Sequence, residues 1–151
     1  MSITMNELTM GRDKTHAIDF TKAVQQNLAV LLQKINIIRE RYGKPMTVNS
    51  GWRPASINAA TPGAAKASKH MVGLAVDIAD ADCALWAWCL ENLDLIQELG
   101  FYLEDKRYTA NWVHFGIGAP ASGKRIFKPS SAAPPAPQLF DGKYDPKYDK
   151  I

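Results

Sequence analysis

Hydrophobic residues recur at helical spacing between Thr21 and Tyr42. Most successive members of this set lie three or four positions apart, the period that places side chains on one face of an α-helix. Gly43 and then Pro45 follow, in the order that usually ends a helix. The set comprises Val24, Leu28, Leu31, Leu32, Ile35, Ile38 and Tyr42. The pattern predicts a core helix over 21–42 and indicates no chemistry in it.

A second helix is predicted over about Ala81 to Leu99. Either Asp80 or Asp82 can cap its start, because a short carboxylate side chain accepts hydrogen bonds from the first free amides of a helix. Gly100 suits its end. The residues expected to face inward are Leu85, Trp86, Cys89, Leu93 and Ile96.

Shorter apolar runs predict β-strands, and alternation along them assigns their faces. The runs are Met46–Ser50, Leu74–Ala79, Phe101–Glu104 and Trp112–Ile117, the last two forming a hairpin around a charged loop. Successive side chains of a strand point to opposite faces, and the bulky set must pack on the helices. The other face then carries Asp77, Glu104 and His114, with Trp112 and Gly116 beside His114. Three strands therefore bring two carboxylates and an imidazole to one open surface.

Composition excludes several classes of protein. The 151 residues are 46% hydrophobic and 22% charged, which is ordinary for one globular domain. A net charge of +3 without a Lys/Arg cluster interleaved with aromatics gives no reason to expect nucleic-acid binding. We see neither a signal peptide nor a membrane span, so the sequence predicts a cytoplasmic product that makes no membrane contact. Cys83 and Cys89 are expected to be reduced packing residues.

The stretch from Ser68 to Asp77, S-K-H-M-V-G-L-A-V-D, carries the candidate metal chemistry. His70 and Asp77 lie seven residues apart, and Asp77 falls inside an apolar run, where a carboxylate is costly unless it is paired or bound to a metal. His114 supplies a second imidazole. Two histidines and one aspartate suffice for a catalytic zinc with an open position. Taken singly, His70 is better explained as a surface loop residue and Asp77 as a buried hydrogen-bonded carboxylate, whereas the two together with His114 favour a metal site.

Three motifs resemble the zinc D,D-peptidases. They are S-x-H-x-x-G-x-A-x-D at 68–77, S-G-W-R-P at 50–54 and W-V-H at 112–114. The family includes D-alanyl-D-alanine carboxypeptidases and the L-alanyl-D-glutamate or cross-link endopeptidases of bacteriophage endolysins. The resemblance runs from about Met5 to Gly118. It implies an α+β fold with a small antiparallel sheet and helices packed on one face, shared with the Hedgehog signalling domain.

The resemblance also implies roles for individual residues. His70, Asp77 and His114 would be the ligands of Zn²⁺, and Arg53 would hold a substrate carboxylate or steady the oxyanion. Ser68 would orient substrate or the metal loop, although a turn-forming serine is an equal alternative, and Trp112 completes the predicted substrate-binding set. Trp52 is expected to be a packing residue.

One position departs from the family pattern. The family usually carries Glu or Asp three residues before the last histidine as the base, and this chain has Asn111, which cannot accept the proton. Glu104 is the substitute we favour. Pairing Leu103 with Val113 would set Glu104 beside Trp112 and diagonally near His114. Asp105, at the edge of the loop, is the second candidate for the base.

The domain organisation that follows is a peptidase-like domain over 1–118, a Pro/Ala/Ser-rich linker or arm over 119–140, and a Lys-Tyr-Asp tail over 141–151. The first hypothesis is a zinc metallopeptidase that cuts peptidoglycan stem peptides or cross-links, as a phage or prophage lysin released from the host cytoplasm at lysis, or as a virion enzyme. The alternative is a weakened or inactive peptidase fold within a phage particle, bound to other virion proteins through the arm and tail. A cytoplasmic D-Ala-D-Ala dipeptidase is a third reading, although nothing in the sequence identifies a closed dipeptide pocket. The tail would be a solvated segment or a docking peptide.

Overall fold

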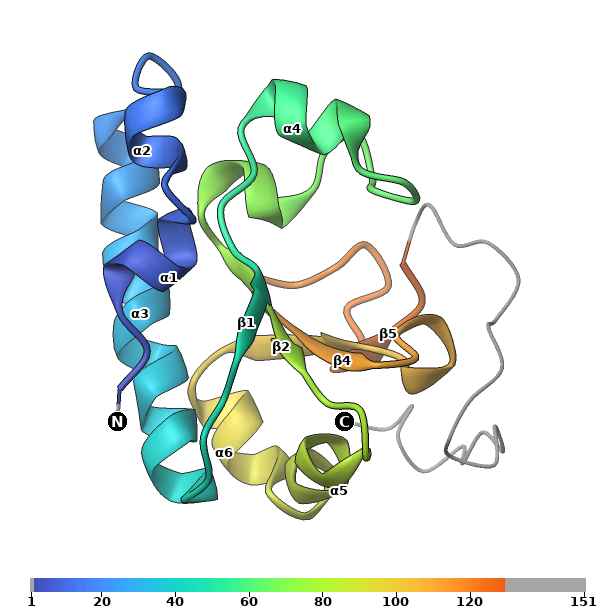
Figure 1. The fold of residues 1–151 in the computed structure, drawn as a ribbon. Coiled ribbons are helices and arrows are strands. Elements are labelled where there is room, and N and C mark those ends of the chain that lie inside the picture. Colours follow the sequence, from blue (N-terminus) through green and yellow to red (C-terminus); the bar gives the residue numbers. More distant parts are fainter. Residues whose placement is uncertain (1, 130–151) are drawn as a thin grey trace.

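The computed structural model describes residues 2–129, which form a mixed α+β domain (Figure 1). The helices are α1 (Met5–Thr9), α2 (Arg12–Thr15), α3 (Lys22–Tyr42), α4 (Ala55–Ala60), α5 (Ala84–Glu91) and α6 (Leu93–Glu98), with short 3-10 turns η1 (Lys69–Val72) and η2 (Lys106–Tyr108). The strands are β1 (Val48–Ser50), β2 (Ala75–Ala79), β3 (Phe101–Glu104), β4 (Trp112–Ile117) and β5 (Ile126–Phe127). The predicted α+β class is confirmed.

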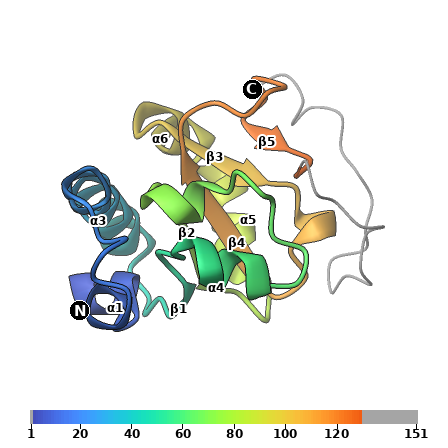
Figure 2. The same cartoon turned by 90° about the horizontal axis from the view of Figure 1, so that it is seen from above.

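The five strands form one sheet in the order β1-β2-β4-β3-β5. The pairs β1–β2, β2–β4 and β3–β4 are antiparallel, and the short β5 is parallel to β3. Figure 2 shows β2 and β4 near the centre of the molecule, with α3 to one side of them. This arrangement places Asp77 of β2 directly opposite His114 of the neighbouring β4.

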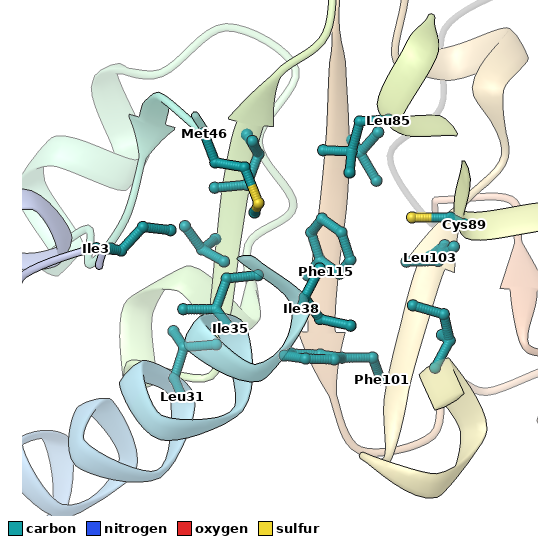
Figure 3. Packing of buried hydrophobic residues seen from close by; sticks show 14 of the residues in the cluster. Ile3, Leu31, Ile35, Ile38, Met46, Leu85, Cys89, Phe101, Leu103 and Phe115 are labelled. Carbon is teal, nitrogen blue, oxygen red and sulfur yellow. The ribbon is translucent and has the colours of Figure 1, made fainter. Parts of the chain in front are cut away.

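The core lies between the sheet and helices α3, α5 and α6. Leu31, Ile35 and Ile38 of α3 are fully buried and face Phe101 and Phe115 of the sheet (Figure 3). The aromatic rings of Phe101 and Phe115 meet edge to face at 5.3 Å between centroids. The helical pattern read from the sequence therefore identifies the buried face of α3, which begins at the capping residue Thr21 and ends at Gly43.

The second predicted helix is interrupted. The structure has α5 and α6 in place of one helix, with a break at Asn92. Asp80 caps the start of α5, because its two carboxylate oxygens accept the amides of Leu85 and Trp86, each at 2.9 Å. Both cysteines are free thiols, as expected.

The register of the β3–β4 hairpin differs from the predicted one by two residues. Leu103 lies opposite Phe115 rather than Val113, and Phe101 lies opposite Ile117. A shift of two preserves which face each side chain occupies, so alternation alone cannot detect it. The shift matters for the candidate site, because continuing this register by one residue sets Glu104 opposite His114 itself.

The folded domain extends beyond Gly118. Strand β5 pairs with β3, and Ile126 is buried in the core, so part of the segment predicted as a linker or arm over 119–140 packs against the domain. A two-residue strand is too short to show periodicity, which is why it could not be predicted from the sequence. The remainder of the predicted arm from residue 130, and the tail over 141–151, lie outside the described residues. Over the described part of the chain, no helix has both the length and the apolar character needed to cross a membrane.

Candidate metal centre

His70 is presented by a tightly defined turn. The hydroxyl of Ser68 accepts the backbone amide of His70 at 3.2 Å, which caps the 3-10 turn η1, and Gly73 ends that turn with a φ of 80°. A Cβ at Gly73 would lie 2.9 Å from the Leu28 side chain, so the position needs glycine for both its backbone angle and its space. The His70 ring is 2% exposed. The chain therefore holds a buried imidazole at a fixed place beside the sheet.

The tautomer of His70 follows from its partners. Nδ1 lies 2.8 Å from the carbonyl oxygen of Gly51, an acceptor, so Nδ1 carries the proton and donates it. Nε2 is then free to act as an electron-pair donor and lies 3.3 Å from Asp77 Oδ2. A backbone carbonyl that orients a ligating imidazole in this way is a common second-layer partner in metal sites. No side chain is involved, so the sequence could not have identified Gly51 in this role.

Asp77 and His114 are brought together by the sheet itself. They are direct partners across the β2–β4 pair, and His114 Nδ1 lies 2.9 Å from Asp77 Oδ1. Burial opposes ionisation of Asp77, but the imidazoles of His70 and His114 outweigh it and hold the pKa of the Asp77 carboxyl well below its usual range. Burial also disfavours the charged form of His114, yet Glu104 and Asp77 raise its pKa above the ordinary value.

These three residues form a donor set that fits zinc. Ligand atoms of His70, Asp77 and His114 all lie within 4.8 Å of one another. Bonds of 2.0–2.1 Å in a tetrahedral site would separate neighbouring ligand atoms by about 3.3 Å. The two contacts between Asp77 and the imidazoles, at 3.3 Å and 2.9 Å, are close to that separation. Two imidazole nitrogens and one carboxylate oxygen are the borderline-soft set that suits zinc and leave a fourth position open. The predicted ligand residues are thus clustered as a catalytic zinc site would require.

Glu104 stands next to this cluster. Its Oε1 lies 3.8 Å from His114 Nδ1, and its side chain is 20% exposed. Burial, reinforced by Asp77, raises the pKa of the Glu104 carboxyl, and the neighbouring His114, His70 and Arg53 oppose that rise without cancelling it. Asn111, by contrast, is exposed, and its carbonyl oxygen accepts the backbone amide of Asp80 at 2.8 Å. Of the two positions, only Glu104 places a carboxylate at the cluster.

The structure separates Asp105 from the site. Its carboxylate caps η2 through the Arg107 amide and forms an ion pair with the Arg107 guanidinium at 2.7 Å. Asp105 is also absent from the residues that line the cleft described below. Geometry therefore leaves Glu104 as the candidate base.

Arg53 enters the site from the segment after β1. It is buried, and its Nη2 donates to Ser68 Oγ at 3.3 Å. Among the described residues its Nε has no hydrogen-bond partner. Burial lowers the pKa of the Arg53 guanidinium, and Asp77 and Glu104 act in the opposite direction. A buried cation with unused donors is suited to an anionic ligand, since guanidinium binds carboxylate through paired hydrogen bonds.

A cleft of about 780 Å³ opens over the cluster. It is lined by the metal-site residues, by Glu104, Arg53 and Ser68, and by Trp112. Small residues of 62–67 and of 119–122 form much of its wall, and Lys69, Tyr108 and Phe127 also contribute. The sequence did not identify these three residues as part of the site. Lys69 could have been noticed because it lies between Ser68 and His70, whereas Tyr108 and Phe127 carry no motif.

Trp52 has a packing role, as predicted. It is fully buried, its ring lies 5.2 Å from that of Phe20, and its indole nitrogen donates to the Met71 carbonyl at 3.0 Å. Trp52 therefore tightens the S-G-W-R-P segment against η1. This leaves the next residue, Arg53, to face the cleft.

Comparison with known protein families gives a match. A family model described as Peptidase M15 matches residues 1–115, which is most of the chain and includes all three clustered ligand residues. A comparison with curated proteins gives no match.

Proposed function

Because the chain belongs to the peptidase M15 family, we propose that it is a zinc-dependent peptidase that hydrolyses stem peptides or cross-links of bacterial peptidoglycan. The observation that carries the proposal is the convergence of His70, Asp77 and His114 at the floor of a cleft, with Glu104 3.8 Å from His114 Nδ1. Family membership supports a peptidase, and the donor set supports zinc.

The zinc ion would be held by His70 Nε2, an Asp77 carboxylate oxygen and His114 Nδ1. When bound, zinc supplies Lewis acidity and makes water reactive near neutral pH. The chain contributes the orientation of its ligands. The Gly51 carbonyl fixes the His70 ring, and the β2–β4 pairing fixes Asp77 against His114.

Glu104 is the proton carrier of the proposed reaction. Its carboxylate takes a proton from the attacking water and returns it to the amine that leaves, since peptide hydrolysis needs both transfers. It occupies the role that Asn111 cannot fill. Burial of Glu104 keeps its carboxylate from being fully solvated, which favours proton transfer over a permanent charge.

Arg53 binds a carboxylate of the substrate. Ser68 keeps the guanidinium in place through its Oγ, and Trp112 offers an aromatic wall to the same cleft. Peptidoglycan stem peptides carry free carboxylates, so a buried arginine beside the reacting centre suits them. The Arg53 guanidinium would also orient the peptide before bond cleavage.

Asn111 favours a second candidate, an inactive or weakened peptidase fold that serves as a structural component of a phage particle. In that case the metal cluster would persist without efficient proton transfer. Location in a phage particle or in a host cell at lysis stays a prediction for either candidate. Binding to other virion proteins through the C-terminal arm also stays a prediction.

The test combines metal analysis with cleavage. Purified protein should contain about one zinc per chain and should release muropeptide fragments from purified sacculi. Asp77→Asn should lose most of the zinc and the cleavage together. A wild-type protein that contains zinc and cleaves neither sacculi nor isolated muropeptides would favour the inactive candidate. A wild-type protein that takes up no zinc would contradict both.

A further inference from the structure

Gly116 lies next to His114 on the open face of β4. The two residues are two positions apart on one strand, so their side chains would share a face. The backbone of Gly116 is outside the left-handed region that favours glycine, unlike that of Gly118 at φ 96°. Backbone conformation therefore gives no reason for a glycine within this strand, where glycine ordinarily weakens the structure.

The space around Gly116 gives that reason. A Cβ at this position would lie 3.1 Å from His114 Nε2 and 3.7 Å from His114 Cδ2. It would also lie 3.8 Å from Lys69 Cδ. The nearest contact is tighter than an ordinary carbon–nitrogen contact, so the imidazole would have to move away.

The direction of that movement is restricted. The opposite edge of the ring carries Nδ1, which lies 2.9 Å from Asp77 Oδ1 and 3.8 Å from Glu104 Oε1. The rings of His70 and Phe127 stand edge-on at centroid distances of 5.2 Å and 6.2 Å. A ring pushed from Gly116 is therefore driven toward Asp77, into the place where a shared metal would sit.

We propose that Gly116 is a positioning residue: the absence of a side chain at this position lets the His114 imidazole present Nδ1 to the metal site. This inference rests on the proposed zinc site. It assigns to Gly116 no contact with substrate or metal.

The experiment compares Gly116→Ala with the wild type and with Gly43→Ala. Gly43 ends α3 at φ 75° with nothing within 4 Å of an added Cβ, so alanine there strains the backbone and touches no site residue. Zinc affinity is measured by competition with a chromophoric chelator, and thermal unfolding is measured on the metal-free proteins. The imidazole signals of the metal-free proteins are recorded by ¹⁵N NMR.

Gly116→Ala is expected to weaken zinc binding by about 10- to 100-fold, as is typical of changes to residues that orient metal ligands. Its metal-free form should unfold at the wild-type temperature or above it, and its His114 ring nitrogens should shift. Gly43→Ala should show the reverse, with a lower unfolding temperature and unchanged zinc affinity.

Equal zinc affinity in Gly116→Ala and wild type would overturn the inference. So would a Gly116→Ala protein that fails to fold without metal, because the tight contact of the added Cβ is with the imidazole and its contact with Lys69, at 3.8 Å, is an ordinary one. If wild-type protein binds no zinc, the proposed function fails on that result alone. Unshifted His114 nitrogens in the metal-free variant would then overturn the role of Gly116 separately.

Discussion

Replacing Arg53 tests how the cleft recognises its substrate. Arg53→Gln removes the guanidinium charge from a position that is almost fully buried, where Nη2 is held by Ser68 and Nε has no partner among the described residues. We expect the variant to keep its zinc, because Arg53 lies outside the donor cluster. Arg53→Gln should bind substrates with a free carboxylate more weakly than the wild type does.

The magnitude follows from the burial of that charge. A hydrogen bond between a charged donor and a carboxylate contributes about 1.5–3 kcal/mol, more than a neutral one. Loss of this interaction should lower kcat/KM by roughly 10- to 160-fold, since about 1.36 kcal/mol corresponds to a factor of ten. Screening by solvent is weak at a buried site, so the full range applies.

The assay compares two substrates and three proteins. A muropeptide with a free stem-peptide carboxylate and its amidated counterpart are cleaved by wild type, Arg53→Gln and Arg53→Lys. The wild type should prefer the acid, Arg53→Gln should lose that preference, and Arg53→Lys should retain part of it because lysine keeps the charge without the planar fork. An equal fall of kcat/KM on both substrates in Arg53→Gln would refute carboxylate binding by Arg53.

Three further predictions concern the surroundings of the site. Lys106→Met should lower the free energy of unfolding by about 3 kcal/mol, because the buried Asp80 carboxylate loses the cation that lies 3.6 Å from it while it continues to cap α5. A denaturant titration that shows no loss of stability would contradict this. Asp105→Asn should cost about 1 kcal/mol through its cap and its partly exposed pair with Arg107, and loss of cleavage at retained zinc would reopen Asp105 as the base. The raised pKa of His114 means that protons compete with the metal up to higher pH than at an ordinary imidazole, so apparent zinc affinity should fall by up to about tenfold per pH unit on acidification below that pKa; a flat profile between pH 8 and 6 would contradict it.

Much of this fold could be predicted from the sequence because its signals are local. The apolar spacing within 21–42 gave the buried face of α3, and alternation placed Asp77, Glu104 and His114 on one face. Both patterns depend on periods of the backbone that hold wherever the chain goes. The metal cluster could be predicted because three motifs resemble a known family and because alternation puts Asp77 and His114 on the same face.

The rest depends on contacts that no local pattern encodes. The predicted β3–β4 register differs from the observed one by two residues, because pairings that differ by two keep each side chain on the same face. Strand β5 is held by its pairing with β3 and has only two residues. The Gly51 carbonyl orients His70 as a backbone group, so no side-chain chemistry at position 51 marks this role.

The observed register also changes the argument about the base. With Glu104 diagonal to His114, its reach to the cluster would have depended on a side-chain rotamer. The observed register, extended by one residue beyond the pair Leu103–Phe115, sets Glu104 opposite His114, and the carboxylate lies 3.8 Å from Nδ1. The predicted register therefore gave weaker support for Glu104 as the base than the observed register does.

The most direct test of the account is Glu104→Gln, measured for zinc content and for muropeptide release from sacculi. Glutamine preserves shape and removes the ability to accept the proton. We predict full zinc content with muropeptide release lowered by about 100-fold or more, within the range that general acid–base groups contribute. Release at the wild-type rate from zinc-loaded Glu104→Gln would contradict the claim that Glu104 takes the place of the carboxylate missing at Asn111.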